Sequence, residues 1–305
     1  MKRVLPLLVL LILAVIDLSA GHGLHWAGGV LLWKLRLPRM LTAAAAGAAM
    51  ALSGAQMQAL FRNPLADPHI MGVSGGAGLG AVIAALSVTG GSSIGLVGAA
   101  FAGALLTALA VVAMASRVQN TATLLLGGVM LGFVLSAASS ILQYRAGEES
   151  LKLFYNWMAG SFSHVPYSAL LLISIALAVG CLLALYHARS LDLLLFGDDF
   201  AAAAGLRLKP VRRQVMLGCV LMTGAVTAFC GPVGFVGIAA PHLVRYTQGT
   251  AVHRSVLPWS LVYGAALALA GDILAHIGPT PLPVGSTLAL VGIPLILVFL
   301  WKERF

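Results

Sequence analysis

Long apolar segments alternate with short polar ones along the whole chain. Between Arg39 and Arg62 about twenty residues pass without a charged side chain, and an apolar helix of about 20 residues crosses the ~30 Å hydrocarbon core of a bilayer. Small residues recur every four positions in this segment: Ala43, Gly47, Ala51 and Ala55. Because small residues let helices in a membrane approach closely, the pattern predicts a packed transmembrane helix. A polar turn at Asn63-Pro64 then leads into a second apolar run.

The same pattern predicts ten membrane-spanning segments. They cover residues 4–20, 40–61, 72–88, 94–115, 121–144, 167–187, 214–230, 234–246, 256–276 and 283–301. The eighth is too short for a straight crossing and contains Pro241. The first also resembles a signal peptide, with Lys2-Arg3 before a short apolar run and small residues before Gly21. We interpret it as an uncleaved span, because the rest of the chain is equally membranous.

Composition supports an all-α, polytopic membrane protein with a single transmembrane domain over residues 1–305. Apolar residues make up 60% of the chain and charged residues 9%, whereas soluble domains carry about 25% charged residues. The net charge of +9 does not indicate a nucleic-acid partner, because the basic residues lie at the ends of apolar segments, next to the lipid bilayer. The three cysteines have no metal-ligand spacing and are interpreted as small buried apolar residues.

The distribution of basic residues predicts that both termini are cytoplasmic. With ten spans and a cytoplasmic N-terminus, thirteen of the 18 lysines and arginines fall on the inner side, as the positive-inside rule requires. The exceptions are Lys34, Arg36, Arg39, Arg145 and Lys152. The second and seventh spans each begin at an arginine and end near a proline turn, at Asn63-Pro64 and Gly231-Pro232. They would run in opposite directions, which indicates an inverted repeat of the kind found in transporters.

Two connections are long enough to hold structure of their own. The outer one, residues 145–166, contains aromatic residues suited to the membrane interface. The inner one, residues 188–213, is the most polar part of the chain. Within it, Asp198 and Asp199 precede an alanine run that ends at Gly205. Acidic residues at the start and a glycine at the end predict a short helix.

The apolar segments contain little of the chemistry that a membrane enzyme or ion-driven carrier needs. The glycines between Gly72 and Gly80 are not followed by the lysine and hydroxyl residue of a phosphate-binding loop, so we assign them to helix packing. Only Asp17 and Asp272 among the acidic residues fall within spans, both near the predicted outer ends. No proton relay, metal site or cofactor site is expected in this chain. The energy for transport should therefore come from another protein, although an ion- or proton-coupled secondary transporter remains the alternative.

Several motifs carry a family resemblance over essentially the whole chain. They are Leu35-Arg36-Leu37-Pro38-Arg39, the run from Ser53 to Pro68, Gly72-Val73-Ser74 with Gly76-Ala77-Gly78, the run from Gly231 to Gly237, and Pro241-His242 with Arg245. In these residues the sequence resembles the permeases of type II ABC importers, which take up iron–siderophore chelates, haem and cobalamin. The resemblance implies a permease in the bacterial inner membrane that pairs with a second copy of itself. Two cytoplasmic ATPase subunits would bind ATP and Mg²⁺, and an extracytoplasmic substrate-binding protein would deliver the cargo.

The resemblance also implies roles for particular residues. Coupling to the ATPase would involve Gly197, Asp198, Asp199, Ala201, Gly205 and Leu206. Docking of the binding protein would involve Arg36, Arg39 and His276. A cytoplasmic gate would be formed by Asn120, Thr121 and Ala122, in the connection before the fifth span. The fifth and tenth spans would provide the walls of the transport pathway.

Overall fold

The computed structural model describes residues 4–20, 29–87, 93–118, 120–163 and 165–302. Within these residues the chain forms thirteen α-helices. They are α1 (Val4–Ser19), α2 (Leu37–Phe61), α3 (Val73–Ser87), α4 (Ser93–Arg117), α5 (Thr121–Tyr144), α6 (Glu148–Met158), α7 (Tyr167–Tyr186), α8 (Ala188–Leu195), α9 (Asp198–Ala203), α10 (Leu208–Cys230), α11 (Val236–Gln248), α12 (His253–His276) and α13 (Val284–Lys302). A π-helical turn, η1 (Leu32–Arg36), precedes α2, and a 3-10 turn, η2 (Pro68–Met71), precedes α3.

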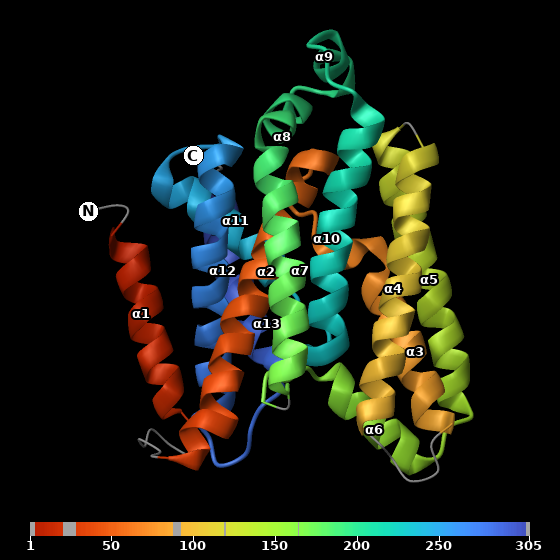
Figure 1. Ribbon diagram of the computed structural model, residues 1–305, viewed down its shortest axis with the longest axis vertical. Helices are drawn as coiled ribbons and strands as arrows, with labels where there is room; N and C mark the ends of the chain where they lie inside the picture. The colour runs from red at the N-terminus through yellow and green to blue at the C-terminus, as the bar shows by residue number, and fades with distance from the viewer. Residues whose placement is uncertain (1–3, 21–28, 88–92, 119, 164, 303–305) are drawn as a thin grey trace.

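Ten of these helices run along one bundle, and they match the ten predicted spans in order (Figure 1). Six of the chain's described helices are long and apolar enough to cross a membrane by themselves, and α1, α3 and α13 include shorter apolar stretches. The remaining one, α11, has 13 residues, or about 20 Å at ~1.5 Å per residue. The all-α membrane fold is therefore confirmed, with a count of about ten.

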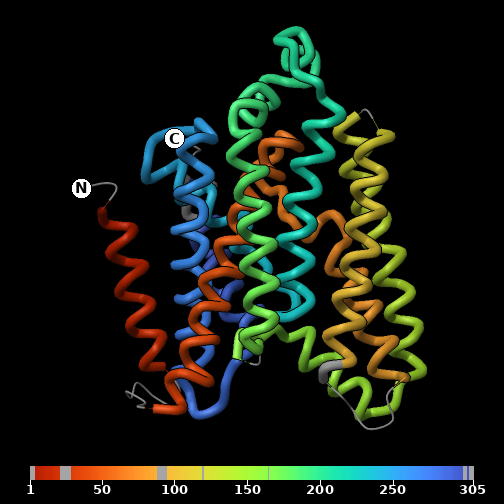
Figure 2. Tube along the Cα trace, viewed as in Figure 1, coloured from red at the N-terminus to blue at the C-terminus, as the bar shows by residue number. Residues whose placement is uncertain are grey.

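Three short helices lie outside this set and define the two ends of the bundle. The helix α6 lies at one end, which we call the α6 end, and α8 and α9 lie at the other, the α9 end (Figure 1). The short helix predicted after Gly197 is thus present as α9, and the outer connection, residues 145–166, contains α6. The start of α1 and the end of α13 both lie toward the α9 end (Figure 2). The second and seventh spans, α2 and α10, run in opposite directions, as predicted (Figure 1).

The helix α10 extends beyond the predicted seventh span, which covers residues 214–230. The helix α10 already begins at Leu208 and includes Lys209, Pro210, Arg212 and Arg213 in its first turns. Hydropathy marks the part of a helix that lies in lipid, and it does not register a helical extension with charged side chains. Proline is compatible with the first turn, because the backbone N–H groups there have no intrahelical partner.

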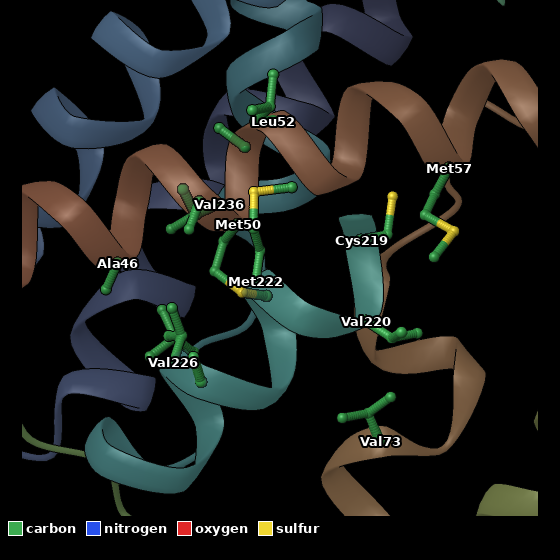
Figure 3. Packing of buried hydrophobic residues seen from close by; sticks show 14 of the residues in the cluster. Ala46, Met50, Leu52, Met57, Val73, Cys219, Val220, Met222, Val226 and Val236 are labelled. Carbon is green, nitrogen blue, oxygen red and sulfur yellow. The ribbon is translucent and has the colours of Figure 1, made fainter. Parts of the chain in front are cut away.

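The centre of the bundle is α2, whose small residues bring other helices into backbone contact. A Cβ atom added at Gly47 would overlap the Gly264 carbonyl of α12 and the side chain of Ala268. A Cβ atom at Gly54 would overlap the backbone of Gly237 in α11. The every-fourth-residue pattern therefore reflects close helix packing. Larger side chains fill the space around these contacts, including Met50, Met57, Met222, Val226 and Val236 (Figure 3).

The glycines at the start of α3 pack in the same way. Gly76 and Gly80 lie against Gly103 and Ala99 of α4, and Gly72 lies against Gly132 of α5. These contacts confirm the packing interpretation of the glycine run. The three cysteines are free, with Cys219 and Cys230 buried.

Two irregular backbone segments meet inside the bundle. The first, around η2, connects α2 to α3, and the second, residues 231–235, connects α10 to α11. The His69 imidazole Nε2 lies 2.8 Å from the Val233 carbonyl oxygen, and the Gln58 side-chain amide donates to the Gly237 carbonyl at 3.4 Å. Irregular backbone at membrane depth is stable only where the protein satisfies its polar groups. The His69 contact joins the two segments, and the Gln58 contact lies beside them, at the start of α11.

Candidate coupling and gating site

The helix α9 projects beyond the other helices at its end of the bundle (Figure 1). Two glycines shape this projection: Gly197 has φ +108° and Gly205 has φ +86°, conformations that side chains of other residues rarely adopt. Asp198 and Asp199 occupy the first turn of α9. The Leu206 N–H donates to the Ala201 carbonyl at 2.9 Å, which closes the C-terminal end. The predicted coupling residues therefore form one compact turn-helix-turn unit.

An exposed aromatic pair lies beside this unit. Phe196 and Phe200 have ring centroids 5.2 Å apart, with 73% and 52% of each residue exposed. Exposed apolar patches bordered by polar residues commonly mark protein contacts. The buried Ala201 fixes the inner side of α9, so the aromatic rings remain available on its outer side.

The three predicted gate residues lie where α5 begins. The Asn120 side-chain oxygen accepts from the Ala122 N–H at 2.8 Å and from the Thr123 N–H at 3.4 Å, and thereby caps the helix. Thr121 is 4% exposed and Ala122 is exposed. The structure thus gives Asn120 a helix-capping contact and turns the Thr121 side chain into the protein. The gating role itself stays a prediction.

The coupling and gate residues, predicted separately, are brought together by Arg212 of α10. A terminal nitrogen of its guanidinium lies 2.5 Å from an Asp198 carboxylate oxygen and donates to the Thr121 hydroxyl at 2.5 Å. The Thr121 hydroxyl in turn donates to the same Asp198 carboxylate at 3.1 Å. We call Asp198, Arg212 and Thr121 the junction triad. It connects α9, α10 and α5 in a single polar contact.

A second polar contact attaches the projecting segment to α12. The Asp192 carboxylate of α8 accepts from the His253 N–H at 2.9 Å and lies 2.6 Å from His253 Nδ1. His253 is the first residue of α12, so Asp192 satisfies a backbone donor at the start of that helix. The sequence alone does not reveal the contacts of Arg212, Asp192 and His253. Charged residues at the ends of apolar segments indicate topology, and their spacing does not show which of them meet.

The predicted docking residues lie at the α6 end, and all three side chains are buried. Arg36, Arg39 and His276 are 8%, 6% and 8% exposed. Arg36 donates to the Leu18 carbonyl at 2.9 Å. Arg39 donates to the carbonyls of Asp17 and Ala20 at 2.9 and 2.8 Å. These carbonyls end α1, where a helix lacks internal donors and favours positive charge. Docking requires groups that a partner can reach, so the docking role stays a prediction.

Arg39 also joins the two acidic residues that the sequence places within spans. Its guanidinium lies 2.9 Å from an Asp272 carboxylate oxygen and 3.8 Å from an Asp17 carboxylate oxygen. His276 Nδ1 lies 3.4 Å from Asp272, and Nε2 lies 2.9 Å from the Ser163 hydroxyl. Asp17 and Asp272 are fully buried. We call Asp17, Arg39, Asp272 and His276 the outer cluster, after the predicted outer ends of the spans that contain the two acids. It holds α1, α2 and α12 together, and paired charges of this kind are the usual form of ionisable groups within a membrane.

Comparison with known proteins identifies this architecture. The model of the FecCD transport family matches residues 4–302. The chain belongs to the FecCD transport family. The vitamin B12 import system permease protein BtuC of Klebsiella pneumoniae is 37% identical over 97% of this chain and 92% of its own length. The hemin transport system permease protein HmuU of Yersinia pestis is 34% identical over 89% of this chain and 83% of its own length.

A solved structure agrees with this assignment. A metal-chelate type ABC transporter in an inward-facing conformation superposes with a TM-score of 0.87 at 32% identity, covering 97% of both chains. Membership of the FecCD family confirms the resemblance to type II ABC importer permeases. It also confirms that the chain is a membrane permease and is not itself an enzyme.

Proposed function

We propose that this chain is the permease of a binding-protein-dependent ABC importer that carries a metal chelate or tetrapyrrole: an iron chelate, haem or cobalamin. Similarity over nearly the full length to permeases named for vitamin B12 and hemin carries this proposal. All three cargo classes are bulky and polar, and the apolar helices of the bundle offer few groups to hold them. Such a pathway fits a cargo that a separate binding protein delivers.

The projecting α8–α9 segment supports an ATPase partner. It combines the exposed rings of Phe196 and Phe200 with a polar attachment to the bundle through the junction triad. In this arrangement a cytoplasmic ATPase binds the α9 end, which places both termini in the cytoplasm. A binding protein then docks at the α6 end.

A second copy of the chain is proposed to complete the pathway. The helix α5 leaves most of its surface uncovered, including Phe133, Val134 and Ile141. The same helix exposes the small polar residues Ser136 and Ser140, which suit a pathway between two subunits better than a surface in lipid. Pairing of two copies along α5 places the predicted gate residues on both sides of one opening.

Copurification tests the ATPase contact. The permease is expressed with its cognate ATPase in the absence of binding protein, and the complex is isolated through a tag on the permease. Replacing the exposed Phe200 with aspartate is expected to abolish ATPase recovery, because a charge then replaces the apolar contact. The matched control replaces Leu282 with aspartate in the same way. Leu282 is 51% exposed in the connection between α12 and α13, and this variant should retain the ATPase. Equal recovery of the ATPase with both variants would contradict this contact.

Reconstituted transport tests the function and identifies the cargo. Proteoliposomes containing the permease and ATPase are supplied with the cognate binding protein loaded with labelled cobalamin, haem or an iron–siderophore chelate. We expect ATP-dependent uptake of one of these cargoes. Uptake that continues without ATPase, driven by an ion gradient, would refute the proposal and favour a secondary transporter.

A further inference from the structure

The junction triad places a buried positive charge between a projecting helix and the start of α5. Arg212 is only 1% exposed, although it lies within the first turns of α10, next to the exposed Arg213. Two of its partners belong to different helices, Asp198 in α9 and Thr121 in α5. A buried arginine retains its charge at all accessible pH values, so it requires partners that stay with it.

We propose that Arg212 is a positioning residue that transmits displacement of α9 to the gate end of α5. This inference rests on the proposed function, in which α9 contacts the ATPase and the start of α5 forms the gate. When the ATPase moves α9, Asp198 moves with it. Separating Asp198 from Arg212 would take an anionic partner 2.5 Å away from a buried charge, which is costly, so the pair moves together. Thr121 follows, because its hydroxyl contacts both charged groups.

The location of Thr121 makes this contact consequential. It is the first residue of α5, directly after the Asn120 cap, and its side chain is 4% exposed. A pull on this hydroxyl therefore acts on the end of the helix rather than on a loose surface loop. Within the triad, Arg212 is the single residue between Asp198 and Thr121, and the direct Thr121–Asp198 hydrogen bond supports the same path.

A static role for the triad would have different consequences. If Arg212 only held three helices together, its replacement would lower stability and reduce ATP hydrolysis and transport in parallel. In the proposed role, variants still hydrolyse ATP but move less cargo for each ATP consumed. The deciding quantity is thus the ratio of cargo transported to ATP hydrolysed. Coupling between sites typically corresponds to about 5- to 150-fold effects, so this ratio should fall at least about fivefold.

The experiment uses the complete complex of permease, ATPase and loaded binding protein in proteoliposomes. The test variants are Arg212→Gln, Asp198→Asn and Thr121→Val. Thr121→Val keeps Arg212 in place and nearly preserves the volume of side chain 121, while it removes the hydroxyl. Two variants serve as matched controls. Arg213→Gln removes the same charge from the adjacent exposed position, and Thr121→Ser restores the hydroxyl. The three test variants should lower the transport-to-hydrolysis ratio, and both controls should retain it.

A conformational measurement accompanies the transport assay. A cysteine introduced at the exposed Thr123 of α5, in a background with Cys181 replaced by serine, reports access to the gate end through its rate of thiol labelling. Trapping the ATPase with nucleotide and vanadate should change this rate in the otherwise unaltered complex and with Arg213→Gln. The change should be absent with Thr121→Val. If Arg212→Gln fails to assemble, Thr121→Val and Thr121→Ser decide the result.

The outcomes separate this inference from the proposed function. If the unaltered complex imports none of the cargoes, the proposed function fails and the inference fails with it. If the unaltered complex imports cargo and Thr121→Val retains both its transport-to-hydrolysis ratio and its labelling response, only the inference is overturned. A parallel loss of hydrolysis and transport in Thr121→Val also overturns it, because that result indicates a static role. The combined Asp198→Asn and Arg212→Gln variant should lose no more than Arg212→Gln alone, since both remove the same contact.

Discussion

Replacing Arg39 with methionine should be the most damaging single change in the outer cluster. Methionine retains most of the side-chain length but removes the positive charge that lies 2.9 Å from Asp272 and 3.8 Å from Asp17. Both acids are fully buried, so the variant contains two buried carboxyl groups that have lost their shared arginine. Removing one partner of a buried ion pair costs about 3–5 kcal/mol. The lost hydrogen bonds to the end of α1 are part of the same change, so we expect a loss of about 3–5 kcal/mol in all.

The free energy of unfolding, measured by detergent titration in mixed micelles, tests this magnitude. Lys34→Met removes one positive charge at an exposed position near the same end of α2 and should change stability by less than about 0.5 kcal/mol. Asp17→Asn should cost about 1 kcal/mol, because Asp17 is the more distant acid. Combining Arg39→Met with Asp272→Asn should recover part of the loss. The reasoning is refuted if Arg39→Met is no less stable than Lys34→Met, or if Asp17→Asn costs as much as Arg39→Met.

Two further predictions concern helix packing and capping. Gly47→Ala should destabilise the protein by about 1–3 kcal/mol, because its Cβ overlaps the Gly264 carbonyl. Gly98→Ala, on a helix with open space around the added Cβ, should be neutral or stabilising by up to about 1 kcal/mol; equal losses in the same titration would contradict the close-packing argument. Asp192→Ala should cost about 0.5–2 kcal/mol by removing the acceptor for the His253 N–H. Asp192→Asn should cost less, because its side-chain oxygen remains; an Asn variant as unstable as the Ala variant would exclude capping as the cause.

The fold could be predicted largely from periodic features of the sequence. Apolar length gave the order of the ten helices along the bundle, and small-residue spacing identified α2 as a packed helix. Both features are local, because membrane insertion depends on a segment's own composition. Helix starts were less accurate, as for α10, because a helix continues past the membrane surface where hydropathy no longer reports it.

The arrangement of charged residues could not be predicted in the same way. Thr121, Asp198 and Arg212 are far apart in the sequence, and no spacing rule joins a helix start to a projecting turn. In the sequence, Arg212 resembled any other basic residue on the predicted inner side. Arg39 and Asp272 were each noted as unusual, Arg39 for its outer position and Asp272 for its place in a span. Only the three-dimensional structure pairs Arg39 with Asp272. This ion pair provides a reason for a buried arginine at that position.

The outer cluster also constrains the order in which this protein can be assembled during synthesis. Asp17 leaves the ribosome before Arg39, and Asp272 follows only when most of the chain has been made. A carboxyl group alone in the bilayer is costly, so α1 is expected to enter the membrane together with α2, as a hairpin in which Arg39 already lies beside Asp17. The helix α12 then brings Asp272 to the same arginine. Release of a nascent chain before α12 would therefore leave a stable hairpin, whereas release before Arg39 would leave α1 with an isolated acid.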